Sequence, residues 1–165
     1  MKKTSFFFLL LLTLISSLRL GYTQQNKNAT ATEDAFKGVK SLKIVYDFDA
    51  ITEIKRLNIF LHAIIDARDR AQAAKIKTDM VLTFRGPSIK LLLKPETELS
   101  EEQKELNELL SELKTGGAKI EVCGFAVNAL KLNTESFLPE VKVVANTINS
   151  LAGYQEQGYK LIHIQ

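Results

Sequence analysis

The chain has few of the residues that build unusual scaffolds. Among its 165 residues are one cysteine, three prolines and eight glycines. A single cysteine excludes a disulfide-stapled fold and a zinc site made of several cysteines, and the low proline and glycine content excludes a collagen-like repeat. Because 45% of the residues are hydrophobic and 25% are charged, the composition predicts an ordinary globular protein with one domain.

Several sequence motifs of enzymes are also missing. The chain contains neither a G-x-G-x-x-G nor a Walker sequence, which disfavours nucleotide binding, and it has no G-x-S-x-G nucleophile elbow. Without a C-x-x-C pair there is no resolving thiol for a disulfide oxidoreductase. The two histidines, His62 and His163, lie a hundred residues apart along the chain, so with one cysteine they make a weak metal site. We therefore expect neither a metal nor a cofactor.

The small excess of positive charge lies at the N-terminus. The chain has 22 basic and 19 acidic residues. Lys2, Lys3 and Arg19 are the only charged residues before Gln24, so the rest of the chain has 19 residues of each sign. The formally neutral remainder gives no reason to expect binding to nucleic acid or to an anionic membrane surface.

The first 23 residues have the layout of a secretory signal peptide. A short basic start is followed by an apolar run, 6–15, and Arg19 interrupts the apolar stretch before it reaches the roughly 20 residues of a membrane span. We expect residues 1–23 to be removed, which makes the protein exported, periplasmic or secreted, with no stable membrane insertion after cleavage. An uncleaved N-terminal anchor is the alternative. Residues 24–39 are polar and lack periodicity, which predicts a flexible segment before a folded domain over 40–165.

Strand and helix patterns alternate through the domain. Short runs rich in β-branched and aromatic residues predict strands, and stretches with apolar residues at helical spacing predict helices. Alternation of this kind is typical of a parallel sheet covered on both faces. The sequence predicts the α/β class, as a three-layer α/β/α sandwich with a five-stranded, mainly parallel sheet, but leaves the strand order open. The predicted strands are 41–47, 78–84, 119–123, 138–144 and 159–164, and the predicted helical stretches are 54–74, 88–93, one opening at Thr97 or Ser100, 125–130, and one from Asn146.

Cys123 closes the third predicted strand, and Gly124 turns the chain into a helix. Ligands of open α/β sheets collect beyond the carboxyl ends of the strands, where helix N-termini also lie. A thiol at such a position has a lowered pKa, and the resulting thiolate can attack sulfur or carry a persulfide. The alternative is a cysteine that only fills space beside Val122 and Phe125, because free cysteines are among the most buried residues.

Other polar residues allow both functional and structural interpretations. Asn58 and His62 share one face of the first long helix, and we expect its N-terminal half near Cys123, where His62 would orient or deprotonate the thiol. A residue at a helix boundary or a subunit contact is the alternative, and His163 fits a packing or edge role. Asp47 and Asp49 follow the first strand as candidate catalytic carboxylates or as caps of the next helix.

One turn is a weak candidate for anion binding. The segment Phe84-Arg85-Gly86-Pro87-Ser88 connects a strand to a helix, so Ser88 would lie near a helix N-terminus. Because anion-binding loops are usually rich in glycine and this turn has only one, the turn is weak evidence for an anion site.

With these elements placed, the chain resembles the DsrE/DsrF-like family, the sulfur-relay proteins that include TusD-type subunits. The resemblance spans about Ser41 to Gln165 and is most distinctive around Cys123 and at the end of the chain. It rests on 43–47, Asn58, 82–87, 121–124 and 153–159.

The resemblance implies a five-stranded parallel sheet, homo- or hetero-oligomers that are commonly trimers or hexamers, and a cysteine at the position of Cys123 that accepts sulfane sulfur. A signal peptide departs from the cytoplasmic relay. We therefore expect an exported, homo-oligomeric sulfur carrier whose partner is a donor or acceptor protein or a small sulfur compound. The alternative is a non-catalytic oligomeric binding or structural module with a packing cysteine. The candidate site is Cys123 with pocket residues Gly124, Asn58, His62, Phe84 and Gly86.

Overall fold

The computed structural model describes residues 33–165, and the chain divides into two units after Lys37. The described part of the first unit holds one turn of helix, α2 (Glu33–Phe36), inside the segment that was expected to be flexible. The predicted signal peptide lies outside the described residues. None of the helices within 33–165 combines the length and the apolar character that a membrane crossing requires.

The second unit contains a five-stranded, all-parallel sheet with the strand order β4-β3-β2-β1-β5. This confirms the predicted α/β class and supplies the strand order, which periodicity could not give. β5 pairs with β1, so the last strand of the chain lies at an edge of the sheet. The strands are β1 (Ser41–Phe48), β2 (Lys77–Phe84), β3 (Lys119–Cys123), β4 (Lys142–Val144) and β5 (Lys160–Ile164).

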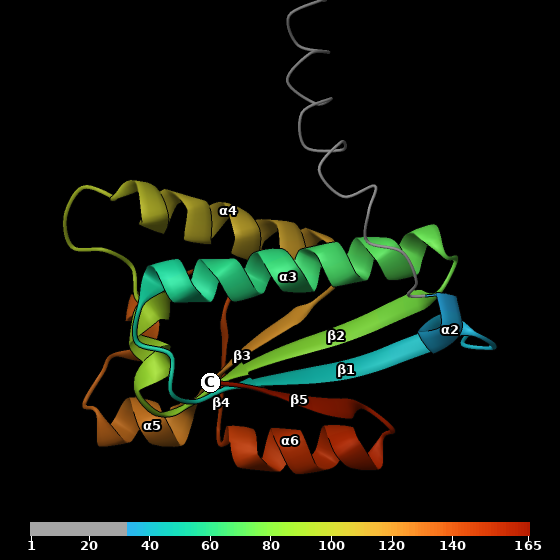
Figure 1. The fold of residues 1–165 in the computed structure, drawn as a ribbon. Helices are drawn as coiled ribbons and strands as arrows, with labels where there is room; N and C mark the ends of the chain where they lie inside the picture. The colour runs from blue at the N-terminus through green and yellow to red at the C-terminus, as the bar shows by residue number, and fades with distance from the viewer. Residues whose placement is uncertain (1–32) are drawn as a thin grey trace, which may run out of the picture. The chain divides into compact units, whose positions relative to one another are not determined.

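Helices cover both faces of this sheet, with α3 and α4 on one side and α5 and α6 on the other (Figure 1). The arrangement is the expected three-layer sandwich. Ser100 caps α4 through a capping box with Gln103, as the spacing S-x-x-Q predicts. The helical elements are α3 (Ile54–Ala73), η1 (Gly86–Leu92), α4 (Glu101–Thr115), α5 (Gly124–Ala129), η2 (Thr134–Ser136) and α6 (Thr147–Glu156).

The fourth strand is shorter than predicted. The apolar run that begins at Leu138 suggested a strand over 138–144, but β4 covers only its last three residues. Pro139 has no N–H group to give to a ladder. The residues before it turn instead toward the end of η1: Phe137 forms a bridge with Leu93, and the Leu138 N–H donates to the Leu92 carbonyl at 3.0 Å.

The face of the sheet beneath α3 and α4 holds the main hydrophobic core. Alternate side chains of β1 and β2, such as Phe48 and Phe84, point into it, and these two rings stack with centroids 4.6 Å apart. Leu57 and Leu61 of α3 and Leu110 of α4 close the layer from above and are fully buried. The stripe of apolar residues at helical spacing thus gives α3 its buried side.

The opposite face, toward α6, has a smaller apolar cluster of Val45, Val81, Leu151 and Tyr159. It also buries polar groups: Glu121 of β3 accepts a hydrogen bond from the Tyr154 hydroxyl of α6 at 2.8 Å. Side chains alternate along a strand, so Cys123, two residues after Glu121, points to this face as well. At the end of β3 it also packs against the main core cluster.

Candidate functional site

A close contact between two turns of the chain fixes the position of Cys123. The thiol stands at the end of β3, directly before α5, and Gly124 follows it. A Cβ on Gly124 would lie 2.6 Å from the Val144 carbonyl oxygen, and the next N–H, of Phe125, donates to the Ala145 carbonyl at 3.1 Å. The β3–α5 turn therefore packs against the β4–α6 turn, which only a residue without a side chain allows.

This contact brings the first residues of α6 to the sulfur. Asn146 caps α6 with its side chain, and its Oδ1 also accepts a weak hydrogen bond from Cys123 Sγ at 3.8 Å. Thr147 is fully buried, and its Oγ1 has no hydrogen-bond partner among residues 33–165. A buried, unpartnered hydroxyl is uncommon in folded proteins, and this one lies beside the thiol.

These donors change the ionisation of Cys123. Burial raises the pKa of the thiol, but the polar groups beside the sulfur, which are the Thr147 hydroxyl and N–H and the N–H groups of Ala126 and Phe125, together lower the pKa below its ordinary value. A donor that bonds to the charged form favours it. The environment therefore favours the thiolate, the nucleophilic form of cysteine.

Cys123 lines a pocket of about 370 Å³. The residue is buried, with 4% of its surface exposed. The exposed side chains of Phe125, Leu130 and Ile148 stand around it. The complete lining consists of Arg85, Gly86, Pro87, Cys123, Phe125, Ala126, Ala129, Leu130, Asn146 and Ile148.

The one cation in this lining, Arg85, is held by two carboxylates. Its Nη2 donates to Asp47 and to Asp49, each at 2.9 Å, and its Nε donates to Asp47 at 3.0 Å. His163 Nε2 lies 3.0 Å from the other oxygen of Asp49. Burial raises the pKa of Asp49, but the hydrogen bond to His163 and the positive charge of Arg85 outweigh it, so the pKa lies below the ordinary range.

These contacts decide the roles proposed for the acidic residues and His163. Asp47 and Asp49 do not cap α3, whose N-cap is Glu53; they anchor Arg85. His163 lies on β5, which is an edge strand of the sheet, and its Nε2 contacts Asp49. The group is an ion-pair network next to the pocket, with its carboxylates engaged by the arginine.

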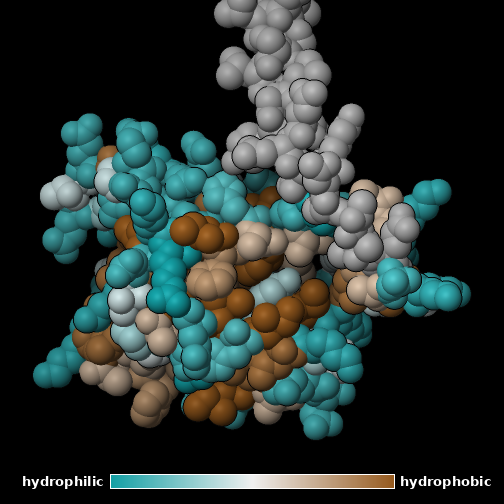
Figure 2. Space-filling model, in the orientation of Figure 1, coloured by the Kyte–Doolittle hydropathy of each residue, from teal (hydrophilic) through white to brown (hydrophobic). Residues whose placement is uncertain are grey.

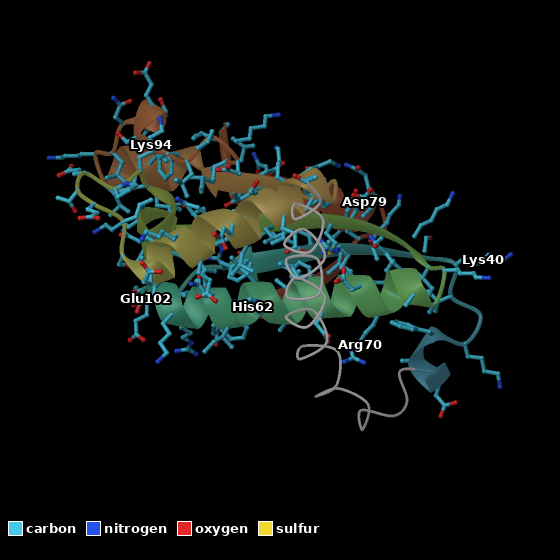
Figure 3. The ribbon with its side chains drawn as sticks, turned by 90° about the horizontal axis from the view of Figure 1, so that it is seen from above. Lys40, His62, Arg70, Asp79, Lys94 and Glu102 are labelled. Carbon is cyan, nitrogen blue, oxygen red and sulfur yellow. The ribbon has the colours of Figure 1, made fainter. Side chains whose placement is uncertain are left out.

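Asn58 and His62 lie between α3 and α4, so the prediction that they lie beside Cys123 is wrong. Asn58 Nδ2 donates to the Glu102 carbonyl at 2.9 Å and to Glu105 Oε2 at 2.8 Å, while His62 Nε2 lies 2.8 Å from Glu105 Oε1. Figure 3 shows His62 on α3 and Glu102 at the start of the neighbouring α4. Both side chains join the two helices and neither lines the pocket of Cys123.

The remaining candidates divide between pocket and core. Gly86 lines the pocket and has φ +56°, and a Cβ there would lie 2.9 Å from the Asp49 carbonyl oxygen, so glycine suits this turn on both counts. Phe84 is fully buried against Phe48 and is a core residue. The Ser88 Oγ lies 2.8 Å from the Phe48 carbonyl oxygen and 2.7 Å from the Arg85 carbonyl oxygen, so its single O–H is engaged within the turn and not by an anion.

Thr147, Asn146 and the pocket position of Arg85 were not predicted. Asn146 had been identified as the start of a helix, but its proximity to Cys123 depends on β4 lying next to β3. The helix start after the fourth strand was the available signal. Within residues 33–165 no group of three His, Cys, Asp or Glu side chains is placed to hold a metal ion.

The model of the DsrE/DsrF-like family matches residues 29–164, so the chain belongs to this family, and membership suggests a sulfur-relay type of function. Comparison with the curated proteins finds no match.

Solved structures share the fold at low sequence identity. MTH1491 of Methanobacterium thermoautotrophicum, a protein of unknown function, has a TM-score of 0.61 at 15% identity, over 74% of this chain and 99% of its own. The ychN protein of E. coli has a TM-score of 0.55 at 15% identity, again over 74% and 99%. BT1422 of Bacteroides thetaiotaomicron, also of unknown function, has a TM-score of 0.52 at 15% identity, over 82% and 100%. At this identity the likeness describes the fold alone.

Proposed function

We propose that the protein carries sulfane sulfur as a persulfide on Cys123. The observation that carries the proposal is a single thiol, bordering a pocket, whose pKa is lowered by a buried hydroxyl and by backbone N–H groups. Family membership points to the same chemistry. The chain has no second cysteine, so an internal disulfide cannot compete with the persulfide.

The transfer step needs no external oxidant. The Cys123 thiolate attacks the outer sulfur of a donor R–S–S–H, a new S–S bond forms, and the S–S bond of the donor breaks. Its electron pair leaves with the donor as R–S⁻, and the proton stays on the transferred sulfur. Delivery repeats the step, with an acceptor thiolate attacking the outer sulfur of the persulfide and Cys123 leaving as a thiolate.

The neighbouring residues serve both steps through the same contacts. The Thr147 hydroxyl and N–H lie where they stabilise negative charge on Cys123 as attacking group and as leaving group. Asn146 holds the start of α6 through its cap on the Ile148 N–H. Gly124 permits the close approach that brings these groups to the sulfur.

Mass spectrometry of the intact chain tests the proposal. After treatment with inorganic polysulfide, the mass should rise by one sulfur atom, about 32 Da, and a reducing thiol should remove the addition. Cys123→Ala should show no gain. If the unmodified protein gains no sulfur, and Cys123 also resists alkylation in the native state, the packing-cysteine module is the correct interpretation and the proposal is wrong.

We also propose that the carrier is exported and forms a homo-oligomer. The leader pattern in residues 1–23 supports export, and N-terminal sequencing of the secreted or periplasmic protein should begin near Gln24. Leu161 and Ile162 on the edge strand β5 are exposed, and apolar surface is visible over β5 and α6 (Figure 2). Sedimentation should give a trimer or hexamer that Leu161→Lys dissociates; a monomeric wild-type protein would contradict the assembly.

A further inference from the structure

The pocket at Cys123 has an apolar lining with few polar groups. Apart from the cysteine, Arg85 and Asn146 are its only polar lining residues, and Asn146 Oδ1 already accepts the Ile148 N–H at 2.9 Å. Phe125 and Ile148 are 68% and 61% exposed, so both offer apolar area that a bound molecule would cover. A volume of about 370 Å³ falls in the range of pockets for small organic ligands.

The charges around the pocket disfavour an anion. Arg85 is its one lining cation, and the two carboxylates of Asp47 and Asp49 outnumber the guanidinium that they bind. His163 contacts Asp49 and does not line the pocket. A sulfur oxyanion such as thiosulfate would enter an apolar pocket without a free counter-charge and would approach a thiolate.

We infer that the sulfur donor for Cys123 is an organic hydropersulfide whose substituent is uncharged and apolar, and not thiosulfate or another sulfur oxyanion. The inference rests on the proposed function and specifies its substrate. The substituent occupies the space between Phe125, Leu130 and Ile148 and directs the outer sulfur toward Cys123. The transfer is the step written above, with the apolar thiolate as leaving group.

Three sulfur donors test how the charge and the size of the donor affect its reaction with Cys123. Benzyl hydropersulfide and 4-carboxybenzyl hydropersulfide, both released in solution from precursors, differ by one carboxylate, and thiosulfate is the oxyanion. Each rate of sulfur gain on Cys123, followed by intact mass, is divided by the rate of the same donor with a small free thiol. The benzyl donor should react at least about tenfold faster than the carboxybenzyl donor on this scale, because the pocket would have to desolvate the added charge.

Two matched variants test the apolar surface. Ile148→Ser removes an apolar group at the pocket, while Ile59→Ser removes an equally exposed isoleucine, also 61% exposed, from α3. Ile148→Ser should slow the benzyl donor about five- to tenfold, the size of effect that lost apolar contacts in a binding pocket produce. Ile59→Ser should leave this rate unchanged.

A third variant tests the charge balance. Asp49→Asn removes one of the two carboxylates that bind Arg85, so it should accelerate thiosulfate and the carboxybenzyl donor relative to the benzyl donor.

The results distinguish a failure of the inferred donor class from a failure of the proposed function. Equal corrected rates for the benzyl and carboxybenzyl donors, or a faster reaction with thiosulfate, would overturn the inference while leaving Cys123 a sulfur carrier. An equal loss in Ile148→Ser and Ile59→Ser would also overturn it. If no donor adds sulfur to Cys123, the proposed function fails, and the inference fails with it.

Discussion

The two faces of the sheet differ in the side chains that the same strands present to them. On the side of α3 and α4, alternate positions carry large apolar residues such as Leu82 and Val122. On the side of α6, the positions between them include Thr83 and Glu121, both buried and polar, and Cys123. One face thus gains stability from buried area, and the other holds its groups by specific hydrogen bonds.

The helices explain the difference. α3 and α4 are 20 and 15 residues long, whereas α6 has 10 and α5 has 6. Long amphipathic helices can bury a broad apolar surface. The shorter helices begin at the carboxyl edge of the sheet, where their first N–H groups meet Cys123. Substitutions on the first face should therefore cause the larger losses of stability, and substitutions around Cys123 on the second face should change its reactivity.

Neighbouring residues of β2 give the largest effect. Leu82 points to the α3–α4 face and Val81 to the α6 face, and both are fully buried. Leu82→Ala should lower the free energy of unfolding by about 3 kcal/mol. Val81→Ala should lower it by about half of that, because it removes two side-chain carbons instead of three and Val81 belongs to the smaller cluster. Urea denaturation measures both. A loss per removed carbon that is smaller for Leu82→Ala than for Val81→Ala would contradict the larger stabilising role of the α3–α4 face.

The turn at Gly124 is the next most sensitive position. Gly124→Ala places a methyl group 2.6 Å from the Val144 carbonyl oxygen, which backbone movement must relieve, so we expect a loss of about 2 kcal/mol and slower alkylation of Cys123. Gly153→Ala is the control, because no atom lies within 4 Å of its added Cβ. In α6 this change should stabilise the protein by up to about 1 kcal/mol. Equal effects of the two substitutions would exclude the close turn.

Asp49 gives a smaller, pH-dependent effect. Because its pKa in the folded protein is lowered, its contribution to stability is present above the ordinary aspartate pKa of about 3.9 and is lost as the pH falls through the folded value. Asp49→Asn should therefore be less stable than the wild type at neutral pH, and the difference should shrink in acid. Denaturation at a series of pH values measures it. A difference that grows in acid would contradict the ion-pair network.

Local patterns predicted the elements well, because strand, helix and cap signals lie within a few residues of each other. The capping box at Ser100 and the strand that ends at Cys123 are examples. The surroundings of Cys123 were harder to predict. Periodicity placed Asn58 and His62 on one face of a helix, but it could not show that Glu105, more than forty residues later, would bind both. Thr147 was missed because its place depends on the strand order.

The pH dependence of Cys123 alkylation tests the central claim most directly. The chain has a single cysteine, so the rate with iodoacetamide reports this thiol alone. The rate should rise with a midpoint below the value of about 8.5 for a free cysteine. Thr147→Val, which keeps the shape and the N–H but removes the hydroxyl, should move the midpoint upward. A wild-type midpoint at or above 8.5, unchanged in Thr147→Val, would contradict the account.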